Sequence, residues 1–232
     1  MYAKFWKRFF DFTLSLLALI VLSPLLIILT VIGAIAMRGN PFFTQARPGK
    51  IDKKTGKEKI FRLIKFRTMS NKKDENGNLL PDEARLNSYG RFLRSTSLDE
   101  LPELVNIIFG SAGVVGPRPF LVRDCVFLTD EQRRRHTVRP GLTGLAQVNG
   151  RNNITWEQKF EYDLQYIDKG ITFKDDLVII LKTIAKVIKR SDVVREGTVS
   201  DMDYGDWLMM EGKVDQATYD EKQEEARQLL KV

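Results

Sequence analysis

The sequence predicts a mostly helical α+β protein in which an N-terminal membrane helix and a small β-hairpin precede a helical cytosolic domain. Three observations predict it: an uncharged run over residues 12–37, an alternating segment over residues 59–69, and helical patterns in much of the later chain. Hydrophobic residues make up 43% and charged residues 29% of the 232 positions, which excludes wholesale disorder and a polytopic membrane protein. The single cysteine, Cys125, excludes an internal disulfide framework and is typical of a reducing compartment.

The uncharged run is long enough to be a membrane element. It has 26 residues, and basic side chains flank it: Lys4, Lys7 and Arg8 before, Arg38 after. At ~1.5 Å per residue, a straight helix of this length covers a hydrocarbon core of ~30 Å. No clear small-residue cleavage site accompanies the run, so a removable signal peptide fits poorly. We expect the segment to stay in the mature protein.

Ser23-Pro24 lies in the middle of this run and predicts a kink or break, because proline removes a backbone donor and disfavours helical geometry at the preceding residue. Each arm alone is then ~18 Å long, too short to span. A single kinked span would place the basic N-terminus on the far side, against the positive-inside tendency. A re-entrant helix–break–helix keeps both basic flanks on one face, and the charge symmetry favours it. We expect Ser23 to satisfy a backbone group that Pro24 frees.

The segments that follow are a hairpin and several helices. Residues 42–47 are predicted to pair with residues 59–68 across a turn at Lys53–Gly56. Helical patterns cover residues 82–94, 98–109, 129–137, 155–169 and 173–190. The last has an apolar stripe beside several lysines, so this helix either covers the core or lies in the membrane interface. The stripe consists of Leu177, Ile180, Leu181, Ile184 and Ile188.

Charge divides the chain into two parts. The net charge is +7, yet residues 201–232 hold nine acids and four bases, which leaves +12 on residues 1–200. A basic body behind a membrane anchor indicates anionic lipid headgroups, phosphorylated substrates, or both. The acidic C-terminal segment is expected to be a solvated helix or a loosely held extension.

Two carboxylates, Asp99 and Glu100, are the strongest candidates for chemistry. Ser97 and Glu100 have the spacing of a capping box, and Pro102 is tolerated in a first helical turn. One interpretation is therefore structural: the acids start a helix and offset its dipole. The other is functional, because a helix start attracts phosphate and paired carboxylates there can attack phosphorus or hold Mg²⁺.

Basic residues supply the second group of candidates. Arg118 lies between Pro117 and Pro119, and the motif is either an ordinary turn or a rigid loop that presents the guanidinium to phosphate. Residues 139–151 combine three glycines with arginines at both ends and indicate an anion site, although the GK[ST] ending of a Walker loop is missing. His136 is expected to be on the surface or structural. Local motifs for zinc chemistry and serine hydrolysis are missing from the sequence.

Five separated motifs resemble the bacterial sugar transferases, the monotopic phosphoglycosyl transferases. They are FTQARPG (43–49), FRLIKFRTM (61–69), LRSTSLDELPEL (93–104), VGPRP (115–119) and RPGLTGLAQVNGRN (139–152). With the Ser-Pro segment, the resemblance covers about residues 1–200 in the right order. The short chain is similar to the small form that acts on diacetylbacillosamine-type UDP-sugars. The expected units are a re-entrant membrane anchor (1–40), a catalytic domain (41–200) and an acidic C-terminal extension (201–232).

The resemblance implies a fold and a reaction. The fold is α+β and mostly helical, with a re-entrant membrane helix broken at Ser23-Pro24, a small β-hairpin and amphipathic interfacial helices around a cytosolic catalytic domain. The reaction moves a sugar-1-phosphate from a UDP-sugar to a polyprenyl phosphate such as undecaprenyl phosphate, at the cytosolic face of the bacterial inner membrane, and releases UMP. It is the first membrane step of glycoconjugate assembly.

The resemblance also implies roles and partners. Asp99 is the nucleophile that forms a covalent phosphosugar–aspartyl intermediate in a ping-pong cycle, and Glu100 binds Mg²⁺. The positions expected to hold phosphate or nucleotide are Lys65, Arg94, Arg118 and Arg151. The expected partners are a UDP-sugar, a polyprenyl phosphate and membrane lipid, with no nucleic acid; a homodimer is an alternative to the monomer. The sequence does not identify the sugar.

One motif departs from the family pattern. Before VGPRP the family usually has Gly-Asp-Met-Ser, whereas this chain has Gly110-Ser111-Ala112-Gly113. Either the absent carboxylate is structural and replaceable, or the enzyme has altered activity or was engineered; the retained Asp99 predicts an active enzyme.

Two other functions compete: a membrane-tethered nucleic-acid-binding or scaffold protein, supported by charge alone, and a transferase that inverts directly without a covalent step.

Overall fold

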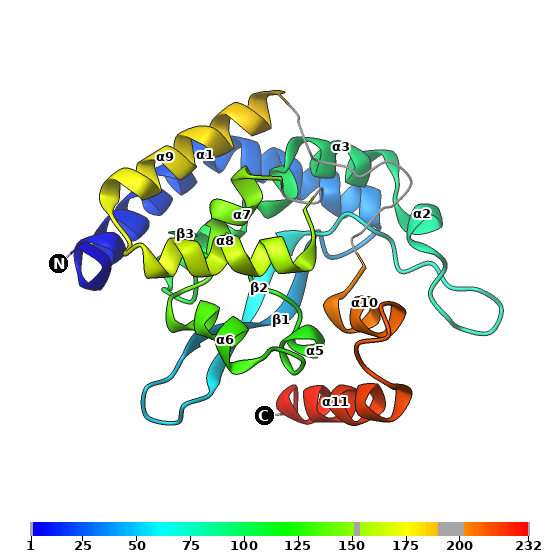
Figure 1. Ribbon diagram of the computed structural model, residues 1–232. Coiled ribbons are helices and arrows are strands. Elements are labelled where there is room, and N and C mark those ends of the chain that lie inside the picture. The colour runs from blue at the N-terminus through cyan, green and yellow to red at the C-terminus, as the bar shows by residue number, and fades with distance from the viewer. Residues whose placement is uncertain (1, 151–153, 190–201, 232) are drawn as a thin grey trace.

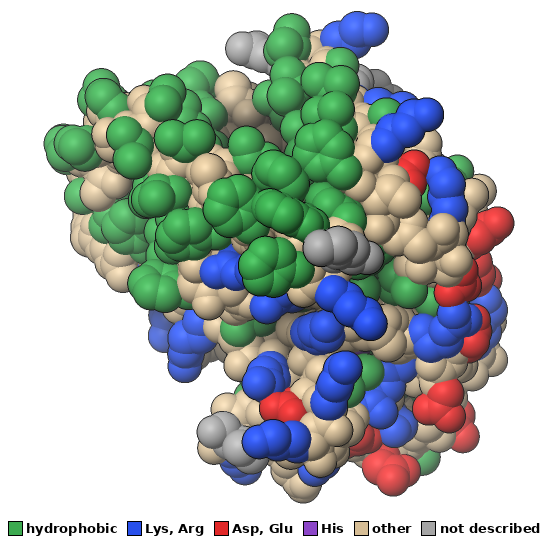
Figure 2. All heavy atoms as spheres, turned by 90° about the vertical axis from the view of Figure 1, so that its left-hand side faces the viewer, with side chains coloured by type: hydrophobic (Ala, Val, Ile, Leu, Met, Phe, Trp, Pro, Cys, Tyr) green, Lys and Arg blue, Asp and Glu red, His purple; other side chains and the backbone are tan. Residues whose placement is uncertain are grey.

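Helix α1 (Trp6–Met37) is the longest element of the computed structural model, which describes residues 2–150, 154–189 and 202–231. It lies across the top of the molecule in Figure 1, with the hairpin and most of the shorter helices beneath it. In length and composition it is a helix that can cross a membrane, and little of it is buried inside the protein. Figure 2 shows apolar side chains gathered on the upper part of one face, with lysines and arginines below them.

Pro24 bends α1 without ending it. The helix continues through Ser23-Pro24, so the expected kink is confirmed and the expected break into two helices is wrong (Figure 1). In a regular α-helix the carbonyl of Ile20 would accept from the N–H at position 24, which proline lacks. The Ser23 hydroxyl donates to the Ile20 carbonyl oxygen at 2.7 Å instead. Ser23 therefore satisfies the freed acceptor, as predicted.

Both halves of α1 rest on the same body. In the first half, Arg8 donates to the carbonyls of Ile107 and Ile108 at 2.5 and 2.6 Å, at the end of helix α4 (Glu103–Ile108). In the second half, the Tyr89 hydroxyl donates to the Leu29 carbonyl at 2.8 Å and the Asn87 amide to the Ala36 carbonyl at 3.2 Å. The two arms of the bent helix are thus anchored to one folded unit.

The hairpin forms as predicted. Strands β1 (Phe42–Ile51) and β2 (Glu58–Phe66) pair antiparallel, with Phe42 opposite Phe66 and an irregularity after Pro48. Asn106 of α4 contacts the backbone of β2: its amide donates to the Arg62 carbonyl at 2.8 Å and its oxygen accepts from the Ile64 N–H at 3.0 Å. One side chain thereby satisfies strand groups that an exposed edge would leave unpaired.

A second pair of strands was not predicted. Strands β3 (Gly113–Val115) and β4 (Gly141–Thr143) run parallel and join the VGPRP loop to the glycine-rich segment. Three residues are too few for an alternating pattern to be recognised. The pairing depends on close backbone approach, since a Cβ at Gly141 would lie 2.1 Å from the Gly116 nitrogen.

The predicted helices are present, with changed bounds. Residues 82–94 divide into α2 (Asp82–Arg85) and α3 (Ser88–Thr96), because Asn87 is extended and caps the Gly90 N–H. Residues 98–109 begin as a 3₁₀ turn, η2 (Leu98–Glu100), before α4. A short 3₁₀ helix, η1 (Tyr2–Lys4), precedes α1. The helical elements between β3 and residue 189 are α5 (Val122–Cys125), α6 (Asp130–Arg133), η3 (Arg134–Thr137), α7 (Leu145–Val148), α8 (Trp156–Asp168) and α9 (Phe173–Lys189).

Helix α9 packs on the core by a narrow face and leaves most of the predicted stripe exposed. Ile179 is buried, and Asp176, also buried, accepts from Lys7 at 2.6 Å and from the Tyr166 hydroxyl at 2.8 Å. Leu181 and Ile188 are 57% and 77% exposed. Of the two expectations for this helix, the exposed stripe favours the membrane interface.

The acidic C-terminal segment is docked rather than loosely held. It forms α10 (Tyr204–Met210) and α11 (Gln216–Leu229), which lie beside α5 in Figure 1. Tyr204 and Leu208 are buried in one cluster with Phe120 and Phe160. The segment therefore extends the core, although its own sequence is strongly acidic.

Leu93 offers a test of how the membrane helix is held. It is fully buried with Leu29 of α1 and Phe66 of β2. We predict that Leu93→Ala lowers the free energy of unfolding by about 2–5 kcal/mol, because it leaves a cavity between three elements. Thermal denaturation in detergent measures the effect. The matched change Leu79→Ala, at an exposed position, should leave the midpoint almost unchanged.

Candidate active site

The carboxylate of Glu100 is the centre of a charged cluster. It is almost fully buried, and its Oε1 accepts from Lys65 Nζ at 2.8 Å and from Arg118 Nη2 at 2.7 Å. Lys65 comes from β2, Glu100 from η2 and Arg118 from the loop after β3. Three predicted site residues, distant in sequence, therefore meet at one oxygen.

The predicted capping box is wrong. Ser97 has a left-handed backbone (φ 56°), ends α3, and makes no side-chain capping hydrogen bond to the 3₁₀ turn. Glu100 turns instead toward Lys65 and Arg118. Two partly buried cations attract the carboxylate more strongly than a backbone N–H at a helix start. The sequence pattern correctly predicts that a helical turn begins here, but Glu100 pairs with Lys65 and Arg118 and does not cap that turn.

A second acid, Glu103, belongs to this cluster and was not nominated from the sequence. Its Oε1 lies 3.1 Å from Lys65 Nζ, and only 3% of the residue is exposed. Burial raises its pKa to about 7, and the negative charge of Glu100 adds to the increase. Glu103 lies about one helical turn after Glu100, and this spacing is the sequence feature that could have identified it as a member of the site.

Asp99 and Arg94 complete the described part of the predicted site. Arg94 donates from Nε to the Thr68 hydroxyl at 3.1 Å. Burial lowers the pKa of Arg94, and the charge of Asp99 opposes this decrease. The pKa of Arg118 is raised mainly by Glu100, with a smaller effect of Asp99. Asp99 therefore acts electrostatically on both arginines. Arg151, the fourth predicted cation, lies outside the described residues.

Two cavities adjoin Arg118 and Gln147, which line both. The first, here called the Glu100 pocket, encloses about 230 Å³ and has a largely apolar wall. The second, the Trp156 pocket, encloses about 170 Å³. The Glu100 pocket is lined by Thr96, Ser97, Leu98, Glu100, Leu101, Arg118, Leu142, Thr143, Gln147, Val148, Thr183, Lys186 and Val187. Its last three residues belong to α9, which also carries the exposed apolar stripe.

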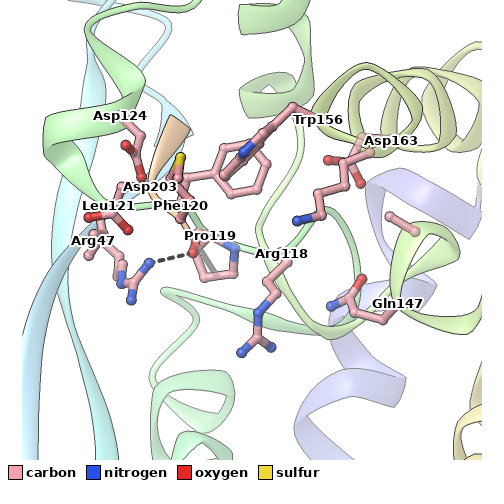
Figure 3. A pocket seen from close by; sticks show the side chains of 13 residues that line it. Arg47, Arg118, Pro119, Phe120, Leu121, Asp124, Gln147, Trp156, Asp163 and Asp203 are labelled. Carbon is pink, nitrogen blue, oxygen red and sulfur yellow. Dashed lines mark hydrogen bonds between the residues drawn. The ribbon is translucent and has the colours of Figure 1, made fainter. Parts of the chain in front are cut away.

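The Trp156 pocket combines three cations, an aromatic wall and carboxylates, and Figure 3 shows it from close by. Arg47, from the FTQARPG motif, donates to the Pro119 carbonyl at 3.0 Å and so fixes the backbone beside Arg118. Burial and the nearby positive charge of Arg118 lower the pKa of Arg47 to about 10. Arg47 was missed by the sequence analysis, although its motif was recognised.

Carboxylates at this site suit a divalent cation only in part. Within the described ranges, three or more His, Cys, Asp or Glu side chains do not gather as a metal site. Magnesium is commonly held by one or two carboxylates together with substrate phosphates and water. The neighbouring Asp99, Glu100 and Glu103 fit that mode better than a cage made of protein ligands.

The departure at residues 110–113 lies away from both cavities. The Ser111 hydroxyl donates to the Asn106 carbonyl at 3.1 Å, and neither cavity is lined by any of these four residues. Asp11 of α1 stands beside this loop, where it accepts from the Val114 N–H at 3.2 Å. The absent family carboxylate therefore maps to the contact with α1.

A buried carboxylate held by a lysine and an arginine, below a long apolar helix, defines a membrane-associated protein whose site suits anionic substrates. The chain matches the bacterial sugar transferase family over residues 2–190, and it belongs to this family of enzymes. The match ends at the last turn of α9, so α10 and α11 lie beyond it.

Several named relatives share this region. The chain is 47% identical over 184 residues to the uncharacterized sugar transferase EpsL of Bacillus subtilis (strain 168), covering 78% of this chain and 87% of that protein. It is 36% identical over 199 residues to the exopolysaccharide production protein ExoY of Rhizobium meliloti (strain 1021), covering 78% and 84%. It is 37% identical over 196 residues to the UDP-glucose:undecaprenyl-phosphate glucose-1-phosphate transferase of Klebsiella pneumoniae, covering 78% of this chain but 40% of that longer protein.

Asp124, at the Trp156 pocket, gives stability a pH dependence. Burial raises its pKa from 3.8 to about 6, with the charge of Asp203 adding to the increase. Between these pH values the folded protein retains a proton on Asp124 that the unfolded chain has lost, so the contribution of Asp124 to stability falls as the pH rises toward 6 and then levels. We predict that Asp124→Asn removes this fall. Denaturant unfolding from pH 4 to 8 measures it, and parallel curves for the two proteins would contradict the assignment.

Proposed function

We propose that this enzyme transfers a sugar-1-phosphate from a UDP-sugar to a polyprenyl phosphate such as undecaprenyl phosphate, and releases UMP. The observation that carries the proposal is the meeting of Lys65, Glu100 and Arg118 beside Asp99. A turn with two adjacent carboxylates and several cations provides both a nucleophile and positive charge for phosphoryl transfer. The Klebsiella relative, by its name, performs such a transfer with UDP-glucose.

In the first half-reaction, a carboxylate oxygen of Asp99 attacks the β-phosphorus of the UDP-sugar. The bond from that phosphorus to the bridging oxygen breaks, and UMP leaves with the electron pair. The sugar-1-phosphate is then bonded to Asp99. In the second half-reaction, a phosphate oxygen of the polyprenyl phosphate attacks the same phosphorus, and Asp99 returns to a free carboxylate.

Charge neutralisation is the main task of the surrounding residues. Lys65 and Arg118 orient Glu100, and with Arg94 and Arg151 they are proposed to balance the charge on the transferred phosphoryl group and the leaving nucleotide. Mg²⁺, which Glu100 is proposed to bind, would supply further positive charge to the phosphate oxygens. Burial raises the pKa of Glu103 to about 7, so this carboxyl carries only part of its negative charge at neutral pH.

The membrane supplies the acceptor, and α1 is proposed to enter it as a re-entrant helix from the cytosolic face of the bacterial inner membrane. Two observations support this topology. Outward side chains of α1 are apolar on both sides of the bend, with Val21 and Ile35 each 74% exposed. Residues near both ends, Arg8 and Ala36, hydrogen-bond to the same body, so crossing to the opposite side would break one set of contacts.

The proposed unit boundaries follow the same contacts, as far as the described residues allow. The anchor (1–40) ends three residues after α1, which stops at Met37 and is followed by a left-handed Arg38. The limit between the catalytic unit (41–200) and the extension (201–232) falls within residues 190–201, which lie outside the described residues.

The nucleophile is tested by substitution. We predict that Asp99→Asn abolishes both UMP release and covalent labelling by a UDP-sugar labelled at the β-phosphorus, because an amide cannot form the intermediate. Glu100→Gln is the matched change at the adjacent position. It should slow turnover by at least about tenfold yet still permit labelling, since charge is lost and the nucleophile is kept. Full UMP release by Asp99→Asn would contradict the proposal, and turnover without labelling in wild type would favour direct inversion.

The topology is tested by labelling from each side of the membrane. In a Cys125→Ser background, Ala3→Cys and Asn40→Cys place thiols outside the two ends of α1, at exposed positions. We predict that an impermeant thiol reagent labels both in inverted vesicles and neither in intact spheroplasts. Labelling of residue 3 from the outside would indicate a transmembrane span.

A further inference from the structure

The C-terminal segment forms part of the wall of the Trp156 pocket. Met202 and Asp203, the first described residues of this segment, line the cavity together with Arg118 and Trp156. These two residues and helices α10 and α11 lie beyond the part of the chain that matches the family. One wall of a cavity beside the VGPRP loop is therefore built by residues outside that match.

Aromatic contacts hold this wall in place. The Tyr204 ring packs on Trp156 and on Phe160, with centroids 5.1 Å apart in both cases. The Gly205 N–H donates to the buried Asp124 carboxylate at 3.3 Å, and a Cβ at Gly205 would lie 2.7 Å from the Phe127 ring. Trp156 therefore contacts the cavity on one side and the C-terminal segment on the other.

Ion pairs position Asp203 at the cavity. Arg123 lies 2.7 Å from an oxygen of Asp206 and 3.2 Å from an oxygen of Asp203. Asp206 also accepts from the Tyr219 hydroxyl at 2.5 Å, and it does not line the cavity. Asp203 does line it, and its side chain is 31% exposed. Both acids therefore pair with Arg123, but Asp203 faces the cavity and Asp206 does not.

Gln147 indicates that the cavity is made for a polar ligand. Its side-chain nitrogen and oxygen are both inaccessible to solvent, and neither has a hydrogen-bond partner among the described residues. Figure 3 shows the Gln147 amide turned toward the side of the pocket where Arg118 lies. A buried amide without partners is costly, so native proteins keep few of them. An amide, a carboxylate and an indole ring around one cavity suit a ring that carries hydroxyl groups.

We propose that Asp203 and Gln147 hydrogen-bond hydroxyl groups of the nucleotide-sugar donor in the Trp156 pocket, so that the C-terminal segment takes part in donor binding. This assignment rests on the proposed function. Asp203 accepts from a hydroxyl, and Gln147 both donates and accepts. Ring hydroxyls occur on the ribose and on the transferred sugar, and these two sources are separated by the test.

The test compares Asp203→Ala with Asp206→Ala in the full-length enzyme. Both changes remove a carboxylate from Arg123, and Asp203 makes no side-chain capping hydrogen bond that alanine would lose. We expect Asp203→Ala to raise the KM for the UDP-sugar about tenfold, the usual effect of losing a hydrogen bond to a charged group, with kcat within about twofold. Asp206→Ala should change KM by less than about twofold.

Two further measurements sharpen the result. Gln147→Leu should also raise KM, while its thermal midpoint stays equal to or above that of wild type, because the substitution removes two unpaired polar atoms. Inhibition by UMP, which has the ribose and lacks the transferred sugar, identifies the group bound. Asp203→Ala weakens this inhibition if the ribose is bound and leaves it unchanged if the transferred sugar is bound.

The outcomes separate this inference from the proposed function. If wild type releases UMP and the two aspartate variants have equal KM values, the role of Asp203 is overturned and the proposed function stands. A rise in KM for both, together with lowered thermal midpoints, would show a merely structural segment and overturn the role as well. If wild type releases no UMP from any UDP-sugar, the proposed function fails, and the assignment fails with it.

Discussion

The carboxylate of Glu100, shared between Lys65 and Arg118, is the interaction on which the arrangement of the site depends. It fixes the second strand of the hairpin, the turn after α3 and the loop after β3 at one point. Removing either cation would leave a buried charge partly uncompensated. Glu103 completes it on the other side of Lys65. The same set of contacts therefore determines both the electrostatics of the site and the relative positions of the elements that form it.

The membrane helix is a part of the fold as well as an anchor. Its first half rests on α4 and its second half on α3 and the hairpin, through the cluster of Leu29, Phe66 and Leu93. Helix α9 adds a second exposed apolar face, and its far end lines the Glu100 pocket through Thr183, Lys186 and Val187. In the proposed reaction, a cavity with a wall on such a helix would allow a lipid-borne phosphate to arrive from the bilayer side.

Elements whose signals are local could be predicted from the sequence. The hairpin followed from alternation and a turn, α8 from the helical pattern over residues 155–169, and the bend in α1 from Ser23-Pro24. Features set by distant partners could not. Ser97 ends α3 in a left-handed conformation and does not cap the next turn, and Glu100 is held by Lys65 and Arg118. The parallel strands rest on backbone contact at glycines, and the docking of the acidic segment rests on Tyr204 and Leu208 in the core and on ion pairs of Asp203 and Asp206 with the distant Arg123. Within the site, the sequence named Lys65, Arg94, Asp99, Glu100 and Arg118 but missed Glu103 and Arg47, whose importance comes from burial.

The hydrogen bond from Ser23 to Ile20 has a consequence for the order of assembly. It joins residues three positions apart, so the bend can form as soon as this short stretch leaves the ribosome. The contacts that dock α1 reach 51 to 169 positions ahead, from Asn87 to Asp176, and these partners are still to be synthesised at that moment. The bend can therefore form before the partners that dock the helix exist, and the rest of the chain can then fold against a helix that already has its final shape.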